Sequence, residues 1–219
     1  MKIKVSKLLF DYNLYPRHKI DPYHVNSMAE SLRAGAEMPP VLVDRKSNRV
    51  VDGFHRVSAY RKVYGPNVKI PAILKEWPDE ASILEEAGIL NASHGRALTT
   101  YDKVRYIALA ETVHLEPERI ASALNIRLER VEELKMERLA GYCLESVALK
   151  RTTSHLAGYE LTDKQVAYNT KAGGLHQTFY INQVIAMLES DTVNWGNERT
   201  VKSLGKLYEL LEKVMTVKV

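Results

Sequence analysis

Cysteine is scarce in this sequence of 219 residues, which contains a single one, Cys143. One cysteine excludes a disulfide bond within the chain, and it excludes the clusters of cysteine ligands that hold structural zinc. Such usage is typical of proteins in a reducing compartment, so we expect a cytoplasmic protein. The sequence around Cys143 predicts that it is a small buried hydrophobic residue.

Long apolar runs are also missing. No stretch of the sequence approaches the roughly 20 apolar residues that span a bilayer, and the first residues lack the apolar segment of a signal peptide. We therefore expect no membrane association. Hydrophobic residues make up 45% of the sequence, which is ordinary for a globular protein. A strong excess of one charge is absent as well, because the net charge is only +4. This mildly basic balance permits nucleic-acid binding without arguing for it.

The pattern of apolar residues divides the chain into a mixed first part and a helical remainder that starts near residue 76. We expect strands over 2–5, 41–43, 50–51 and 68–74, and helices over 22–34, 54–64, 79–91, 101–113, 117–124, 128–139, 163–172, 177–190 and 198–214. Pro71 predicts that the last strand lies near an edge of its sheet, since proline cannot donate to a neighbour. The expected fold class is α+β, a small mixed sheet followed by an all-helical region.

Residues 50–56 have the layout of a phosphate-binding turn. Two valines precede Asp52-Gly53 and the start of a helix, where free N–H groups and the helix dipole favour an anion. Gly53 permits a close approach of the ligand, and Arg56 offers a planar fork for phosphate oxygens. His55 can donate to phosphate or exchange a proton, and Asp52 can hold Mg²⁺ or accept a proton. The plainer interpretation is an Asp-Gly turn with His55 and Arg56 on a helix surface.

Three blocks in the first 110 residues belong together. The first comprises Tyr15-Pro16-Arg17, Met28-Ala29-Glu30-Ser31-Leu32 and Pro40-Val41-Leu42-Val43. The second is Asp52-Gly53-Phe54-His55-Arg56 with Ala59. The third is Asn91-Ala92-Ser93-His94-Gly95-Arg96, with Leu98-Thr99 and Asp102-Lys103. In this order the blocks resemble the boxes of the ParB/sulfiredoxin superfamily, and the resemblance implies that fold for the first domain.

The resemblance also implies a ligand, a nucleoside triphosphate (CTP or ATP) bound with Mg²⁺ between the three blocks. The residues that it implies for nucleotide binding are Arg17, Gly53, His55, Arg56, Asn91 and Arg96. Asn91 matches a position that helps to hold the metal, and Asp52 is the second candidate metal ligand.

The second block departs from the usual family sequences at Phe54-His55. The sulfiredoxin cysteine is absent, which argues against sulfinic acid reduction, and the usual ParB Glu-Arg pair is replaced. An Asp-Gly-x-His-Arg block is similar to that of archaeal free-serine kinases in the superfamily, where the aspartate serves catalysis. The alternative function is therefore a phosphotransferase or nucleotide hydrolase with Asp52 and His55 as catalytic residues. A nuclease has less support, because the sequence shows no dense carboxylate cluster.

Residues 116–138 have the spacing of a helix-turn-helix motif at the place where ParB-like regulators carry one. Ala121 is the small residue of the first helix, and Asn125 tolerates the left-handed conformation that the turn requires. Arg127 and Arg130 are the candidate DNA contacts. The stretch nonetheless contains five basic and six acidic residues, and DNA phosphates would repel the glutamates of its second helix. The alternative is a helical hairpin that packs into the core.

The last 70 residues carry two amphipathic patterns. They predict a helical hairpin, with a homodimer interface as the functional alternative. The sequence thus predicts a nucleotide-binding domain over 1–98, a helix-turn-helix-type domain over 99–145 and a C-terminal helical region over 146–219. The favoured function is a ParB-like protein that binds a nucleotide and DNA, in plasmid or chromosome partition or in transcriptional regulation.

Overall fold

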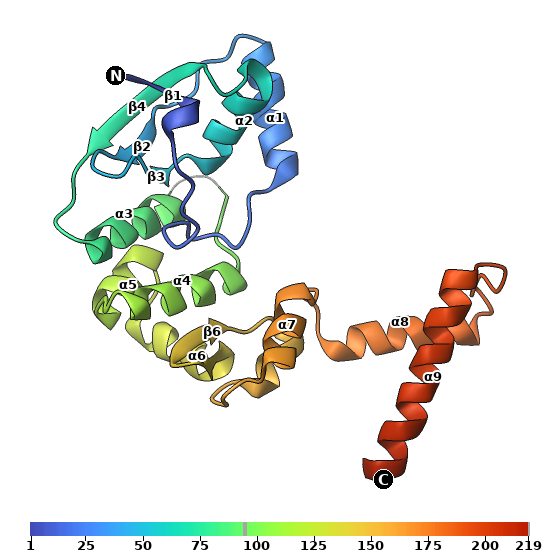
Figure 1. Ribbon diagram of the computed structural model, residues 1–219. Coiled ribbons are helices and arrows are strands. Elements are labelled where there is room, and N and C mark those ends of the chain that lie inside the picture. Colours follow the sequence, from blue (N-terminus) through green and yellow to red (C-terminus); the bar gives the residue numbers. More distant parts are fainter. Residues whose placement is uncertain (94–95, 219) are drawn as a thin grey trace. The chain divides into compact units, whose positions relative to one another are not determined.

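The computed structural model describes residues 1–93 and 96–218, and it contains two compact units (Figure 1). The first unit is Met1–Gly173, and the second is Gly174–Val219. The division into three domains at residues 98 and 145 stays a prediction.

The sheet of the first unit has four strands among the described residues. Their spatial order is β1 (Lys2–Lys4), β4 (Lys69–Lys75), β2 (Val41–Asp44) and β3 (Val50–Asp52). Strand β4 runs antiparallel to β1 and parallel to β2, while β3 pairs antiparallel with β2 at the edge. A short 3-10 helix, η1 (Val5–Lys7), follows β1. The sheet is mixed, as predicted, and the α+β class is confirmed.

Pro71 predicted a strand near an edge, and β4 lies one strand in from the edge, between β1 and β2. Successive residues of a strand direct their backbone groups to opposite sides. Ala72 exchanges hydrogen bonds with Met1 on the β1 side, so the nitrogen of Pro71 faces β2. The paired residues of β2 begin at Val41, which lies opposite Ala72. Pro71 therefore lies just before the first paired residues of β2 and β4, where its missing N–H costs no hydrogen bond between the two strands.

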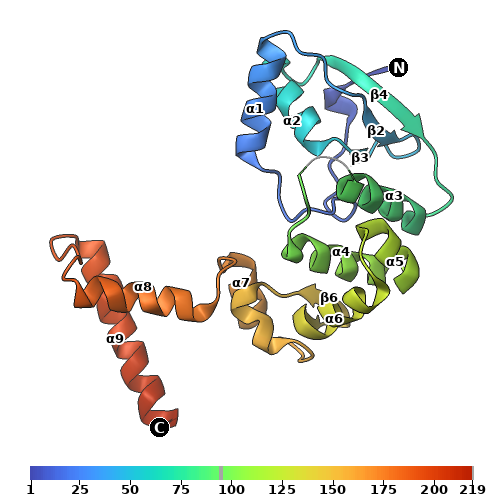
Figure 2. The same ribbon diagram turned by 180° about the vertical axis from the view of Figure 1, so that it is seen from behind.

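Different helices cover the two faces of the sheet (Figures 1 and 2). On one face Val50 packs in a buried cluster with residues of α2 (Phe54–Tyr64), and α1 (Pro22–Arg33) packs against α2. On the other face Val51 joins the cluster built by α3 (Glu80–Ser93) and the helices that follow. Both valines are fully buried. The strand that leads to the predicted phosphate turn is therefore fixed from both sides.

The remainder of the first unit contains the predicted helices and one β-hairpin that the sequence did not predict. Its elements are α4 (Thr100–Thr112), α5 (Pro117–Leu124), α6 (Leu128–Arg138), β5 (Leu139–Tyr142), β6 (Glu145–Ala148), the 3-10 helix η2 (Arg151–Leu156) and α7 (Asp163–Lys171). Strand β5 follows α6 directly, so no break in the sequence marks the change from helix to strand.

The turn of this hairpin consists of Cys143 and Leu144, which adopt φ values of 50° and 69°. Tight hairpin turns with two positive φ values usually contain Asn and Gly, so these two residues give no recognisable turn signal. Cys143 is exposed at the turn, and the prediction of a buried cysteine is wrong. The physical reason is that the tip of a two-residue turn projects from the sheet into solvent.

The second unit consists of α8 (Gln177–Glu189) and α9 (Glu198–Lys218), close to the predicted boundaries. No residue of α8 is buried. Large apolar side chains that remain exposed on the two helices are Phe179, Tyr180, Ile181, Ile185, Met187, Leu188, Val201, Leu207, Tyr208, Leu210, Leu211, Val214 and Met215. The two helices therefore leave much of their apolar surface uncovered, and the packed core of the predicted helical hairpin is not seen among the described residues. None of the described helices is long and apolar enough to span a membrane.

Candidate functional site

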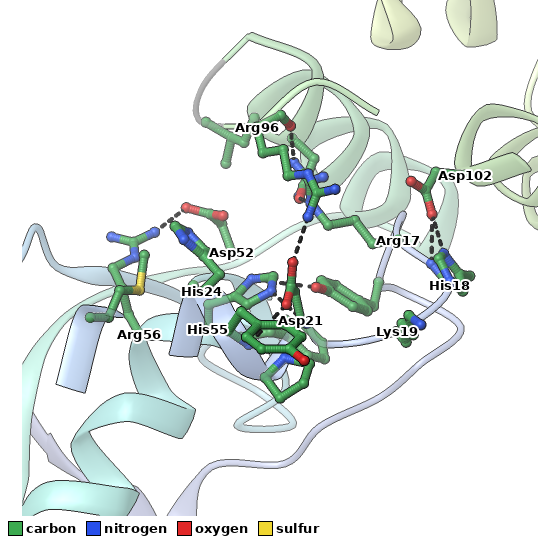
Figure 3. Close-up of a pocket in the computed structure, with 18 of the residues that line it drawn as sticks. Arg17, His18, Lys19, Asp21, His24, Asp52, His55, Arg56, Arg96 and Asp102 are labelled. Atoms are coloured by element: carbon green, nitrogen blue, oxygen red, sulfur yellow. Dashed lines mark hydrogen bonds and ion pairs between the residues drawn. The ribbon is translucent and has the colours of Figure 1, made fainter. Parts of the chain in front are cut away.

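A cavity of about 880 Å³ opens at the N-terminus of α2 (Figure 3). Its walls come from the segment that precedes α1, from the junction of β3 with α2, and from the stretch between the end of α3 and the start of α4. The predicted residues that line it are Arg17, Asp52, Gly53, His55, Arg56, Asn91 and Arg96. The fold therefore gathers residues from all three sequence blocks around one cavity, although they are distant along the chain.

Gly53 lies between the end of β3 and the start of α2, and its backbone is left-handed with φ of 107°. A Cβ atom at this position would lie 2.7 Å from Cγ1 of Val41, a buried residue of β2 that cannot move aside. Glycine is therefore required twice, by conformation and by space. As a result α2 starts directly at the cavity wall, where its first N–H groups have no partner within the helix.

Asp52 and Arg56 flank this turn and bind each other. The guanidinium of Arg56 in α2 donates to the carboxylate of Asp52, which lies four residues earlier at the end of β3. It also donates to the carbonyl oxygens of Pro39 and Pro40, at 3.0 and 2.7 Å. The side chain of Arg56 is 15% exposed and that of Asp52 is 30% exposed, so both remain accessible from the cavity. The predicted phosphate ligand and the predicted catalytic carboxylate form one ion pair.

His55 uses both of its ring nitrogens within the protein. Its Nε2 accepts the backbone N–H of Asp21 at 3.0 Å, and its Nδ1 lies 3.5 Å from the hydroxyl of Tyr15. Burial, supported by the positive charge of His24 and Arg17, lowers the pKa of His55 to about 4. The imidazole is therefore neutral at physiological pH. In this arrangement His55 holds the start of α1, and its phosphate-binding and catalytic roles stay predictions.

A chain of polar contacts joins Asp21, Arg96 and Arg17 (Figure 3), and it continues to Asn91. The carboxylate of Asp21 accepts from the guanidinium of Arg96, and the carbonyl oxygen of Arg96 accepts from Arg17. Nε of Arg17 also donates to Oδ1 of Asn91 at 3.3 Å, while Nδ2 of Asn91 donates to the carbonyl of Ala87. The predicted nucleotide-binding residues of the first and third blocks thus contact each other directly.

Two cavity residues, His18 and Asp102, were not predicted as site residues. Nδ1 of His18 lies 2.8 Å from Oδ1 of Asp102, which also accepts the backbone N–H of His18 at 2.8 Å. Asp102 completes a capping box with Thr99 at the start of α4. The sequence did signal the cap, through a threonine followed by an acidic residue three positions later. It could not signal that the same carboxylate binds a histidine 84 positions away.

Arg105 of α4 fixes the segment that carries Arg17 and His18. Its guanidinium donates to the carbonyl oxygens of Tyr12, Tyr15 and Arg17. Burial lowers the pKa of Arg105, although an arginine remains charged at any physiological pH. The wall of the cavity therefore depends on a helix that lies beyond the predicted boundary at residue 98.

The donor atoms of the expected metal site are few. Among the described residues, no group of three or more His, Cys, Asp or Glu side chains could hold a metal ion. Asp52 is paired with Arg56, and Oδ1 of Asn91 accepts from Arg17. Mg²⁺ in nucleotide sites is usually held by one or two carboxylates together with substrate phosphates and water. Both predicted metal ligands are thus engaged by arginines, and their role in holding Mg²⁺ stays a prediction.

Helices α5 and α6 form as predicted, joined by a turn at Asn125, which has φ and ψ of 50°. Their facing apolar residues Ile120, Leu124, Val131 and Leu134 are buried. Of the candidate DNA contacts, Arg127 is exposed immediately before α6. Nη1 of Arg130 is paired with Glu133 at 2.6 Å and lies 3.7 Å from Glu137. The charge of Arg130 is thus compensated by carboxylates of its own helix.

Comparisons with known proteins agree with the sequence blocks. Residues 2–92 match the family model of the ParB N-terminal domain. The predicted ParB/sulfiredoxin relationship is therefore supported for this part of the chain, which is similar to the ParB N-terminal domain. Of the third block, His94 and Gly95 lie outside the described residues. No curated protein gives a match to the chain.

Several solved structures are similar at low identity. The C-terminally truncated chromosome-partitioning protein ParB from Caulobacter crescentus, complexed to the centromeric parS site, is 16% identical over 78% of each chain, with a TM-score of 0.45. The same protein complexed with CTP-gamma-S is 18% identical over 78% of this chain and 84% of that one, with a TM-score of 0.37. A Pnob8-like ParB-N domain is 20% identical over 68% and 56%, with a TM-score of 0.38. At these values the likeness carries no argument about function.

Proposed function

We propose that the chain is a ParB-like protein that binds a nucleoside triphosphate and DNA, in partition or transcriptional regulation, because residues 2–92 match the ParB N-terminal domain. The observation that carries the proposal is the cavity at the start of α2, around which Gly53 and three arginines are gathered. A helix N-terminus with a left-handed glycine is a ready-made anion site, and guanidinium groups suit phosphate oxygens.

In the proposed complex the phosphates lie at the N-terminus of α2, against Gly53 and Arg56. Arg17 and Arg96 approach from the opposite wall, and CTP and ATP are the candidate nucleotides. Asp52 and Asn91 would hold Mg²⁺, which would neutralise part of the phosphate charge. His55 would stabilise this arrangement indirectly, because its Nε2 accepts the backbone N–H of Asp21 in the segment that leads into α1.

DNA would be bound by α5 and α6 as a helix-turn-helix. Support comes from the left-handed turn at Asn125 and from Arg127, which is exposed at the N-terminus of α6. In a helix-turn-helix the N-terminal residues of the second helix face the bases. We further propose a homodimer, supported by the uncovered apolar surface of α8 and α9, since such surfaces mark interaction sites.

Calorimetric titration of the protein with CTP, ATP, GTP and UTP in the presence of Mg²⁺ tests the nucleotide proposal. We expect one nucleotide to bind, and Arg96→Ala to weaken it. Arg45→Ala is the matched control, because Arg45 is exposed outside the cavity and pairs with Glu76. At a hundredfold excess over its Kd the nucleotide should raise the free energy of unfolding by about 2.7 kcal/mol. No binding by any nucleotide, or equal loss in both variants, would contradict the proposal.

The second candidate function is a phosphotransferase or nucleoside-triphosphate hydrolase. The observation that favours it is the carboxylate of Asp52 at the very turn where phosphates are proposed to bind. As a catalytic residue Asp52 would accept the proton of the attacking hydroxyl, with His55 as the second candidate. Release of inorganic phosphate or transfer of the terminal phosphoryl group by the wild type, lost in Asp52→Asn, is the expected result. A nuclease is less supported, since the described residues contain no acidic metal cluster.

A further inference from the structure

His18 and Asp102 form a second polar group in the wall of the cavity, away from the proposed phosphate site. Figure 3 shows His18 and Asp102 on the side of the cavity opposite Asp52 and Arg56, with Arg17 and Asp21 between them. The side chain of Asp102 is 4% exposed, whereas that of His18 is 36% exposed and lines the cavity. A buried carboxylate thus holds an accessible imidazole at the end that lies away from the proposed phosphate site.

The hydrogen bonds of Asp102 determine its ionisation. Its Oδ2 accepts from the backbone N–H and the hydroxyl of Thr99, at 3.0 and 2.7 Å. Its Oδ1 accepts from the backbone N–H and Nδ1 of His18, both at 2.8 Å. Burial by itself raises the pKa of Asp102, but the hydrogen bonds from Thr99 and His18 outweigh it and leave the pKa below its usual value. The carboxyl group is therefore ionised at neutral pH.

This ionised carboxylate fixes the tautomer of His18. A carboxylate accepts hydrogen bonds and cannot donate them, so Nδ1 of His18 must carry a proton. In the neutral ring the lone pair then resides on Nε2. No described residue forms a hydrogen bond with Nε2 of His18, whereas both nitrogens of His55 are engaged. Of these two histidines, only His18 therefore has a ring nitrogen without a hydrogen-bond partner among the described residues. The sequence analysis did not predict His18 as a site residue.

We infer that Nε2 of His18 accepts a hydrogen bond from an O–H or N–H group at the nucleoside end of the ligand. The inference rests on the proposed function, because the triphosphate at α2 directs the nucleoside toward this end of the cavity. A ribose hydroxyl and the exocyclic amino group of a cytosine or adenine base share the required chemistry. Asp102 is a positioning residue, since it acts through the tautomer and orientation of His18.

Titration of wild type, His18→Phe and His18→Gln with CTP, UTP, 2′-deoxy-CTP, 3′-deoxy-CTP, ATP and inorganic tripolyphosphate, each with Mg²⁺, tests the inference. Loss of one hydrogen bond should weaken the preferred nucleotide about fivefold to tenfold in His18→Phe. The affinity for tripolyphosphate, which lacks a nucleoside, should stay the same. His18→Gln should restore part of the affinity, because the glutamine carbonyl is an acceptor. Equal melting temperatures of the variants show that the fold is intact.

The ligands separate the two sources of the donor. If the amino group binds His18, the preference for CTP over UTP falls in His18→Phe. If a ribose hydroxyl binds His18, the preference for CTP over one of the deoxy nucleotides falls instead. Unchanged nucleotide affinity in His18→Phe would overturn the inference and leave the proposed function standing. Absence of binding by every nucleotide and by tripolyphosphate would remove the proposed function as well.

Nitrogen NMR of the imidazole supplies a readout that a purely structural role would not move. The preferred nucleotide should move the Nε2 resonance of His18, while tripolyphosphate should not. Asp102→Asn should move the proton toward Nε2, because an amide can donate to Nδ1. An Nε2 resonance that the preferred nucleotide leaves in place would overturn the inference.

Discussion

The guanidinium of Arg56 donates to the carboxylate of Asp52, so that a cation and an anion of the cavity neutralise each other. Arg96 and Asp21 repeat this relationship on another wall. Each carboxylate occupies donors that a phosphate would otherwise use. A triphosphate that enters the cavity must therefore displace Asp52 and Asp21 from their arginines or bring a cation that binds them.

Asp52→Asn tests this competition. The change removes a negative charge beside the proposed phosphates and frees part of Arg56, so the nucleotide should bind about fivefold more tightly in the absence of Mg²⁺. Calorimetric titration at low salt measures it. Asp44→Asn is the control, because Asp44 is also an aspartate at a strand end but does not line the cavity. Weaker binding in Asp52→Asn without Mg²⁺ would contradict the competition.

Gly53→Ala should destabilise the protein and abolish ligand binding. The left-handed backbone costs an alanine about 1 to 2 kcal/mol, and the contact with Val41 adds overpacking of a similar size. Gly35→Ala is the matched control, since Gly35 also has a positive φ but a Cβ there would meet nothing within 4 Å. Denaturant unfolding should show a loss of about 1 kcal/mol for Gly35→Ala and clearly more for Gly53→Ala. Equal losses would mean that Val41 does not restrict the turn.

The burial of neutral His55 makes stability depend on pH. The pKa of His55 is about 4 in the folded protein against an ordinary 6.5, so the unfolded chain binds more protons between these values. The free energy of unfolding should therefore fall as the pH decreases from about 6.5 to about 4. His55 is partly exposed, and screening by solvent limits its share to about 1 to 2 kcal/mol.

Denaturant unfolding across this pH range, compared between wild type and His55→Gln, isolates the share of His55. The slope of stability against pH should be shallower in the variant, because glutamine does not titrate. The pKa values of Asp21 and Asp102 are lowered in the folded protein, so these residues change the free energy of unfolding only at pH values below the range in which His55 titrates. Identical slopes would show that His55 is not buried as a neutral ring.

The two candidate DNA contacts should behave differently. Arg127 is exposed immediately before α6, while Arg130 is paired with Glu133. Arg127→Ala should weaken DNA binding and reduce the slope of log affinity against log salt by about 1, as expected for one phosphate contact. Arg130→Ala should have a smaller effect. Fluorescence anisotropy with a labelled duplex at several salt concentrations measures both, and equal effects would argue against the ion pair in the complex.

The exposed apolar face of α9 should support self-association. Leu211 is 52% exposed on this helix, and a charge placed there in a dimer interface would be desolvated without a partner. Leu211→Glu should therefore convert a dimer into a monomer in light scattering coupled to size-exclusion chromatography. Lys206→Glu is the control, because it changes the charge of the same helix at a residue that is already polar. A wild-type monomer at high concentration would contradict the homodimer.

Local sequence patterns determined most of the helices and the phosphate turn. Caps and glycines mark the ends of α1, α2 and α4, and the period of apolar residues is set within each element. The hairpin of β5 and β6 escaped, because it depends on pairing between strands and its turn contains Cys143 and Leu144. The place of β4 inside the sheet also escaped, since strand order is a property of the assembled fold.

The sequence by itself determined which residue types were available to the cavity, and the resemblance of its blocks to the ParB/sulfiredoxin boxes implied that Arg17, Arg56 and Arg96 would bind one nucleotide. Only the tertiary structure decided which of their atoms are free. It paired Asp52 with Arg56, closed both nitrogens of His55, and left Nε2 of His18 open through its bond to Asp102. The physical reason is that hydrogen bonds between residues distant in the sequence depend on distances that packing sets, and no local pattern records those distances.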